Sequence, residues 1–326
     1  MKKKLFRLTL WALLFALCFS AEAQQSKKVP RIGFLASAGP ETPNIAAFRR
    51  GLRDLGYIEG KNILIEYRYM EGMMDRIPSL VAELEQLKVD ILVSPVPAAI
   101  RAAKQATKTI PIVMMITTDP VATGLIDSLA RPGGNVTGLT RLTRDLSGKR
   151  LELLKEVVPR ISRVGVLDDA DAPVQTKGFK DYGDAARALK IQLQSLEVRG
   201  PNPDFEGTFQ AAAKGRVSAL ITVRTTLLIG YRKQIADLAI KNRLPSMSEG
   251  SDFVEDGGLM SYSANDAESF KRAAVYVDKI LKGAKPGDLP VEQPKKFEFI
   301  INLKAAKQIG LTIPQSVLYR ADKVIK

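Results

Sequence analysis

Short strand-like runs alternate with amphipathic helical segments along all but the start of the chain. In the first helical segment the apolar residues Ile45, Phe48, Leu52 and Leu55 recur at helical spacing, and the segment ends at Gly56, a residue typical of a helix C-terminus. Parallel strands need long crossover connections, which are usually helices. The alternation therefore predicts an α/β fold in which helices cover parallel sheets.

Ten segments have the length and composition of strands. They span residues 31–35, 89–94, 110–116, 136–139, 163–167, 191–198, 219–223, 245–248, 259–262 and 297–303. A chain of 326 residues is long enough to bury two separate cores, so we expect two sheets in two Rossmann-like lobes.

Three clusters of turn residues interrupt the series of strands and helices. They are residues 131–135, 256–258 and 283–290. Three breaks indicate that the chain passes three times between the lobes, and a hinge of three strands would let the lobes close around a ligand. The predicted division assigns residues 29–139 and 263–285 to the N-terminal lobe and residues 140–262 and 286–326 to the C-terminal lobe.

The first 23 residues have the pattern of a secretory signal peptide. Three lysines and Arg7 precede an apolar stretch over residues 8–19, which is too short to span about 30 Å of hydrocarbon, and Ala21 and Ala23 form a small-x-small cleavage site. We therefore expect cleavage after Ala23 and a periplasmic location. A lipid anchor on Cys18 is disfavoured, because Leu17 stands where a small residue would precede a lipidated cysteine.

Loss of the signal peptide leaves a chain without cysteine, so disulfide and thiol chemistry are excluded. It also removes four cations and one acidic residue, which leaves a net charge of about +11. Lysine and arginine are scattered among acidic residues rather than clustered, so we expect no binding to nucleic acid. The charge favours attraction to an anionic membrane surface or to an acidic docking partner.

Several segments resemble the substrate-binding proteins of ABC transporters, in the branch that includes tryptophan- and tyrosine-binding members. They are residues 51–63 (GLRDLGYIEGKNI), 119–121 (DPV) with 124–125 (GL), 130–138, 149–156, 257–262, and 289–294 with 301–304. The resemblance covers nearly all of the chain after the signal peptide. It implies a type I periplasmic-binding fold with a ligand cleft between the lobes, and a membrane permease with its ATPase as partners. We expect a monomer.

The chain departs from the pattern of these relatives at two strand ends. Residues 94–97 (SPVP) stand where many relatives have Gly-Thr-Pro, and residues 224–226 (RTT) stand where many have Asp-Pro. Both departures could change what the pocket binds.

Ligands of open α/β sheets bind outside the carboxyl ends of the strands, and this rule selects loops in both lobes. The candidate ligand-binding residues are Ser37, Ser94, Ala98, Thr117, Thr118, Asp119, Arg224, Glu249 and Tyr262.

Each candidate in the first lobe has a structural alternative. Asp119 could pair with a ligand ammonium, or it could cap the helical turn that begins at Pro120. Ser94 and Ala98 open a helix whose free N–H groups would suit a carboxylate, or they form a plain turn. Ser37 could contact the ligand or be an ordinary turn residue.

Each candidate in the second lobe also has a structural alternative. The Arg224 guanidinium could grip an anionic group in bidentate fashion, be a solvated charge, or form a salt bridge between the lobes. Glu249 could likewise contact the ligand, be a solvated charge, or form a salt bridge between the lobes. Tyr262 could stack on a ligand ring or pack at the hinge.

The main competing class of function is an enzyme. The chain has no histidine, so the commonest general base and the Ser-His and Cys-His nucleophile systems are missing. Neither a Gly-x-Gly-x-x-Gly fingerprint nor a phosphate-binding loop is present, and we expect no cofactor and no metal. A ligand sensor that presents its closed state to a membrane receptor is a second alternative.

We expect a solute-binding protein that delivers an amino acid or related carboxylate, aromatic or not, to an ABC importer. Contacts to both lobes are complete only in the closed form, so the ligand would stabilise closure by its differential affinity.

Overall fold

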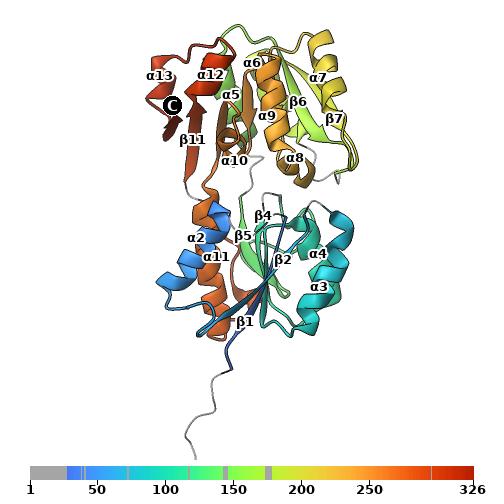
Figure 1. Ribbon diagram of the computed structural model, residues 1–326, viewed down its shortest axis with the longest axis vertical. Helices are drawn as coiled ribbons and strands as arrows, with labels where there is room; N and C mark the ends of the chain where they lie inside the picture. Colours follow the sequence, from blue (N-terminus) through green and yellow to red (C-terminus); the bar gives the residue numbers. More distant parts are fainter. Residues whose placement is uncertain are drawn as a thin grey trace, which may run out of the picture.

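The computed structural model describes residues 28–37, 39, 42–71, 73–116, 118–141, 146–172, 178–294 and 296–326. The predicted signal peptide and Cys18 lie outside these residues. The described chain forms two α/β lobes, one above the other in Figure 1, each built on its own sheet. None of its described helices has both the length and the apolar character needed to cross a bilayer.

The first lobe contains a five-stranded parallel sheet with the order β2-β1-β3-β4-β5. Its strands are β1 (Arg31–Ala36), β2 (Leu64–Tyr69), β3 (Ile91–Ser94), β4 (Ile112–Ile116) and β5 (Val136–Thr140). The edge strand β2 is absent from the ten predicted segments. Its side chains are all half-buried, and Glu66 and Arg68 interrupt its apolar run, so its sequence lacks the signature of a buried strand.

Helices cover both faces of the first sheet (Figure 1). Helices α3 (Ile77–Gln86) and α4 (Pro97–Ala106) pack on one face, and α2 (Pro43–Asp54) and α11 (Asp266–Leu281) pack on the other. Thr42 caps the start of helix α2, where its hydroxyl accepts a hydrogen bond from the Ile45 N–H at 3.2 Å, and the helix ends before Gly56, whose φ is +87°.

The second lobe contains a seven-stranded sheet with the order β12-β11-β10-β9-β8-β6-β7. Only the pair β10 and β11 is antiparallel. The strands are β6 (Arg163–Asp169), β7 (Gln192–Val198), β8 (Ala219–Thr222), β9 (Ser246–Ser248), β10 (Met260–Ala264), β11 (Phe297–Asn302) and β12 (Lys323–Ile325). The edge strand β12 has only three residues, none of them fully buried, so it is too short to be recognised from sequence.

The helices of the second lobe also lie on both faces of its sheet. Helices α5 (Ser147–Val157), α6 (Gly183–Leu189), α12 (Leu303–Gln308) and α13 (Gln315–Leu318) share one core cluster. Helices α7 (Phe205–Lys214), α8 (Thr226–Gly230), α9 (Arg232–Lys241) and α10 (Ser251–Glu255) contribute to the other. Short 3-10 turns lie at Met74–Arg76, Phe179–Tyr182 and Pro286–Asp288.

The chain passes three times between the two sheets, which confirms the predicted three-segment hinge. The passages follow β5, join β10 to α11 at Asn265, and precede β11. The turn clusters that predicted these passages do not lie at the passages themselves. Each cluster lies earlier in the chain, before the strand or segment from which the chain crosses to the other lobe.

The division of the chain between the lobes remains a proposal, which the contacts of residues 286–292 refine. The Thr137 hydroxyl donates to the Leu289 carbonyl at 2.7 Å, and the Glu292 N–H donates to the Gly138 carbonyl at 3.0 Å. These residues pack against the first sheet, so we propose that they belong to the first lobe rather than to the second.

Helices α2 and α11 cross at very short range at Gly51. A Cβ at this position would lie 2.6 Å from the Lys271 carbonyl oxygen and 2.9 Å from the Ala274 Cβ. The packing of α11, which the chain reaches only after most of the second lobe, therefore depends on the missing side chain at Gly51.

We predict that Gly51→Ala lowers the free energy of unfolding by about 1–3 kcal/mol, because the added methyl group forces the two helix backbones apart. Gly230→Ala is the matched control, since a Cβ there meets nothing within 4 Å. Urea denaturation monitored by circular dichroism measures both variants. Equal stability of the two variants would contradict the close contact.

Candidate functional site

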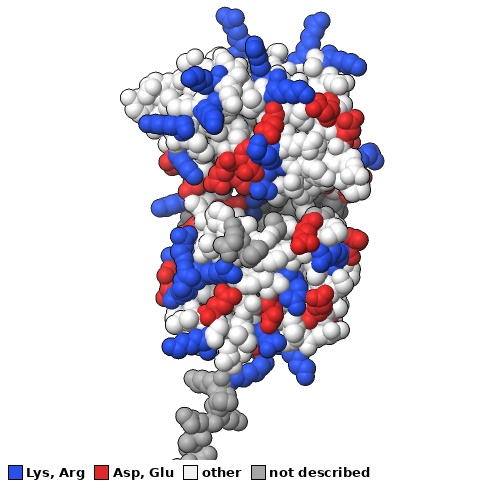
Figure 2. All heavy atoms as spheres, viewed as in Figure 1, with Lys and Arg blue, Asp and Glu red and all other residues white. Residues whose placement is uncertain are grey.

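A cavity of about 660 Å³ lies where the carboxyl ends of the two sheets face each other. Its described lining comes from both lobes, including the ends of β1, β6 and β8 and the starts of α2, α4 and α11. Acidic and basic side chains of the second lobe gather at the level where the lobes meet (Figure 2). This is the place that the strand-end rule selects for a ligand.

Four of the predicted residues line this cavity: Ser37, Ala98, Thr118 and Arg224. The hydroxyl of Thr118 is buried and has no hydrogen-bond partner among the described residues. Thr117 lies outside the described residues.

The structure places Ser94, Asp119 and Tyr262 away from the cavity lining, and their side chains have structural contacts. The Ser94 hydroxyl donates to the Leu35 carbonyl at 2.8 Å and accepts from the Val96 N–H at 3.1 Å. The Asp119 carboxylate accepts from the N–H groups of residues 121 and 122, which is the capping alternative. The Tyr262 ring packs against two phenylalanines of β11, with centroids 6.0 and 6.5 Å away.

Glu249 lies behind the cavity wall rather than in it. Its carboxylate is 4% exposed and accepts hydrogen bonds from the Tyr182 hydroxyl (2.8 Å), the Arg150 guanidinium (3.2 Å) and the Arg224 N–H (3.1 Å). The Arg150 Nε donates to the Tyr262 carbonyl at 2.9 Å, so this cluster ties the end of β8 to strand β10 next to the hinge. Burial and the nearby Glu249 charge hold the pKa of Tyr182 well above its usual value.

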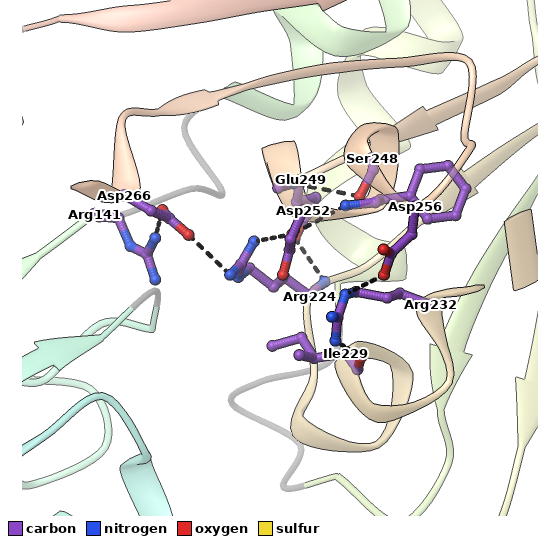
Figure 3. A network of polar contacts seen from close by, with 11 residues as sticks. Arg141, Arg224, Ile229, Arg232, Ser248, Glu249, Asp252, Asp256 and Asp266 are labelled. Atoms are coloured by element: carbon purple, nitrogen blue, oxygen red, sulfur yellow. Dashed lines mark hydrogen bonds and ion pairs between the residues drawn. The ribbon is translucent and has the colours of Figure 1, made fainter. Parts of the chain in front are cut away.

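Arg224 is the centre of an ion-pair network at the edge of the cavity (Figure 3). Its guanidinium contacts the Asp252 carboxylate at 2.8 Å and the Asp266 carboxylate at 2.9 Å. The other oxygen of Asp266 pairs with Arg141, which follows β5 at the first hinge passage. Beside this network, Arg232 pairs with Asp256 at 2.6 Å. The salt-bridge alternative for Arg224 is the arrangement that the structure contains.

Arg141 keeps one buried donor that the described part of this network does not engage. Burial and the neighbouring Arg224 charge lower the pKa of Arg141 to about 9, and its Nε has no hydrogen-bond partner among the described residues. Burial acts to raise the pKa of Asp252, but the guanidiniums of Arg224, Arg232 and Arg141 overcome this and keep the pKa below its usual value. Asp252 is therefore ionised at neutral pH.

The start of α4 supplies further donors to the cavity. Its first residue is Pro97, its N-cap Val96 makes no side-chain hydrogen bond, and the N–H groups of Ala98 and Ala99 precede the first intrahelical bond. Arg101 lies one turn further on and also lines the cavity, with no ion pair recorded in the described part of the chain. Side chains such as Ile45, Val96 and Phe270 make the apolar part of the wall.

Sequence reasoning missed several residues of this site, namely Arg101, Arg141, Asp252 and Asp266. Arg141 directly follows strand β5, so the strand-end rule applied to that strand would have selected it. Asp252 and Asp266 lie in the first turns of helices and Arg101 lies in the second turn of α4, and no local pattern distinguishes them from solvated charges.

We predict that Glu249→Ala lowers the free energy of unfolding by about 3–5 kcal/mol, because it removes the carboxylate that pairs with the fully buried Arg150 guanidinium. Glu156→Ala is the control, since Glu156 and its partner Arg320 are both exposed and their loss costs at most about 1 kcal/mol. Chemical denaturation of the two variants checks this. A small loss for Glu249→Ala would mean that the cluster contributes little to stability.

Two parallel-sheet lobes, three connecting segments and a cavity between the strand ends define a type I periplasmic binding protein. The model of the family of ABC transporter substrate binding proteins matches residues 42–325, and the chain belongs to this family.

Similar proteins agree with this assignment. The chain is 28% identical over 294 residues to the tyrosine-binding protein of Clostridioides difficile (strain R20291), which covers 88% of this chain and 82% of that protein. A conserved domain protein from Vibrio cholerae is 28% identical with a TM-score of 0.81, over 91% of this chain and all of that one. An ABC domain from Streptococcus pneumonia in complex with L-Trp is 25% identical with a TM-score of 0.79, over 90% of this chain and 100% of that one.

Proposed function

We propose that this protein is the extracytoplasmic receptor of an ABC importer and that it binds a small solute with a carboxylate group. The observation that carries the proposal is a set of donors on the first-lobe side of the cavity that have no acceptor among the described residues. The set consists of the Ala98 N–H group, the Arg101 guanidinium, the Thr118 hydroxyl and the Arg141 Nε. A carboxylate satisfies such donors with charge-assisted hydrogen bonds.

The body of the ligand would lie against the apolar part of the wall. Phe270 and Ile45 come from the first lobe and Ile300 from the second, so an apolar or aromatic group would contact both lobes. The tyrosine-binding protein and the domain in complex with L-Trp support an aromatic ligand by similarity.

Closure of the lobes would be a population shift. A solute that contacts only the first lobe in the open form gains the contacts of the second lobe on closure, and this differential affinity stabilises the closed form. A shift from 1:99 to 99:1 takes about 5.5 kcal/mol. The closed, monomeric protein would then dock on the permease, which transfers the solute with the help of its ATPase.

Binding rather than catalysis is supported by the family, whose members are substrate-binding proteins. The sequence also lacks histidine, and the arginines and carboxylates at the cavity edge neutralise one another in ion pairs. A carboxylate held in this way is a poor general base.

We predict that Arg101→Gln weakens the binding of a carboxylate ligand by about 10- to 100-fold, because a charge-assisted hydrogen bond is lost. The ligand is first found by a thermal-shift screen of amino acids, aromatic acids and hydroxy acids, in which a ligand at 100 times its Kd adds about 2.7 kcal/mol to stability. Isothermal titration calorimetry then compares the variants.

Lys108→Gln is the control for Arg101→Gln. It removes one positive charge near the other end of α4, where the Lys108 ammonium donates to the Lys104 carbonyl at 2.8 Å, outside the cavity lining. Its affinity is expected to equal that of the unchanged protein. No binding of any carboxylate in the screen would refute the proposed function. Uptake of the labelled ligand in cells with and without the gene tests delivery to an importer, and equal uptake would refute it.

A further inference from the structure

The carboxylates of the cavity are already engaged by the protein. Of the described acidic residues in the lining, Asp252 and Asp266 pair with Arg224, and Asp256 pairs with Arg232. These are the acidic groups that lie around the arginine cluster in Figure 3, Asp252 and Asp256 from the second lobe and Asp266 from the start of α11. Each of them has a guanidinium within 2.9 Å.

The remaining acidic residues of the lining also have partners. Glu298 accepts a hydrogen bond from the Asn265 amide at 2.6 Å, and Glu255 lies 3.6 Å from the Lys323 ammonium. Asp169 accepts from the Asp171 N–H at 3.0 Å, and Asp171 accepts from the Gly200 N–H at 2.9 Å. Within the described lining, no carboxylate is left without a donor.

Several hydrogen-bond donors of the cavity, by contrast, have no acceptor among the described residues. The Arg141 side chain is 8% exposed, and its Nε is a buried donor without a hydrogen-bond partner among the residues that the structure describes. Within the same residues the buried Thr118 hydroxyl has no partner, and Arg101 and the start of α4 add further donors. The polar groups of the described lining that have no partner are therefore donors, and they would bind acceptor atoms of a ligand.

An ammonium group is a poor fit to such a cavity. In a partly dry cleft it needs a carboxylate partner, and beside Asp252 or Asp266 it would lie against the Arg224 guanidinium that both of them hold. The two like charges would repel each other in the same cavity. A carboxylate, a keto oxygen or a hydroxyl group of the ligand meets free donors and displaces nothing.

We infer that the ligand is a carboxylic acid without an ammonium group, such as a hydroxy acid, a keto acid or an aryl- or alkyl-substituted acid, and that Arg224 excludes amino acids by occupying Asp252 and Asp266. This inference rests on the proposed function, since it specifies the solute of the same cavity.

The test compares acids with and without the amino group in calorimetric titrations of the unchanged protein. The pairs are L-phenylalanine with 3-phenyllactate, L-tryptophan with indole-3-lactate, L-leucine with 2-hydroxyisocaproate, and L-glutamate with 2-hydroxyglutarate. In every pair that binds, the hydroxy acid is expected to bind at least 10-fold more tightly. An amino acid that binds as tightly as its hydroxy acid, or more tightly, overturns the inference and leaves the proposed function standing. Absence of binding in all pairs overturns both.

A variant tests the part assigned to Arg224. Arg224→Gln frees Asp252 and one oxygen of Asp266, so the affinity ratio of hydroxy acid to amino acid is expected to fall at least 10-fold. The ratio is measured on one protein sample, so a reduced fraction of folded protein does not change it. Arg68→Gln is the matched control, because Arg68 pairs with Glu83 at 2.7 Å outside the cavity lining, and its ratio is expected to stay unchanged. An unchanged ratio in Arg224→Gln would overturn the assigned role of Arg224.

Discussion

A single buried carboxylate joins three parts of this protein that are distant in sequence. Asp266 begins helix α11 at the second hinge passage, Arg141 follows strand β5 at the first, and Arg224 follows strand β8 in the second sheet. Asp266 is only 5% exposed, and removal of one member of such a buried pair costs about 3–5 kcal/mol because a charge is left alone. The relative position of the hinge segments, and with it the edge of the cavity, depends on this charge compensation.

The wall of the cavity next to the hinge is fixed before any ligand arrives. The Arg224 backbone is held by Glu249, and its guanidinium is held by Asp252 and Asp266. Glu249 is in turn fixed by Arg150, which also contacts the carbonyl of Tyr262 on β10. These side chains are already ordered in the folded protein, so ligand binding does not have to reduce their conformational entropy. Preorganisation of this kind strengthens binding without additional contacts.

The fold was predictable because the alternation of apolar strand segments and amphipathic helix segments is repeated many times along the chain. Strands with fully buried patterns, such as β3 and β4, are recognisable from apolar composition alone, whereas β2 and β12 lie at sheet edges, where half-buried and polar residues remove that signal. The topology rule also places Ser37, Ala98, Thr118 and Arg224 at the cavity. It could not distinguish a side chain that faces the cavity from one that caps a turn or supports the wall. Asp119 and Glu249 differ from Arg224 in partners that only the folded chain brings together.

The first lobe is discontinuous in sequence, and this sets the order in which the molecule can be completed. One of its two core clusters contains Phe270, Ala273, Ala274, Tyr276 and Val277 of helix α11, which is synthesised after β6 to β10 of the second lobe. Until α11 exists, one face of the first sheet is covered by α2 alone, and its remaining apolar surface is open to other chains. The contacts that close it span more than 200 residues, as from Tyr57 to Asp278, and such distant contacts form slowly. Both lobes are thus completed only by the last part of the chain, because the second sheet needs β11 and β12, which follow α11.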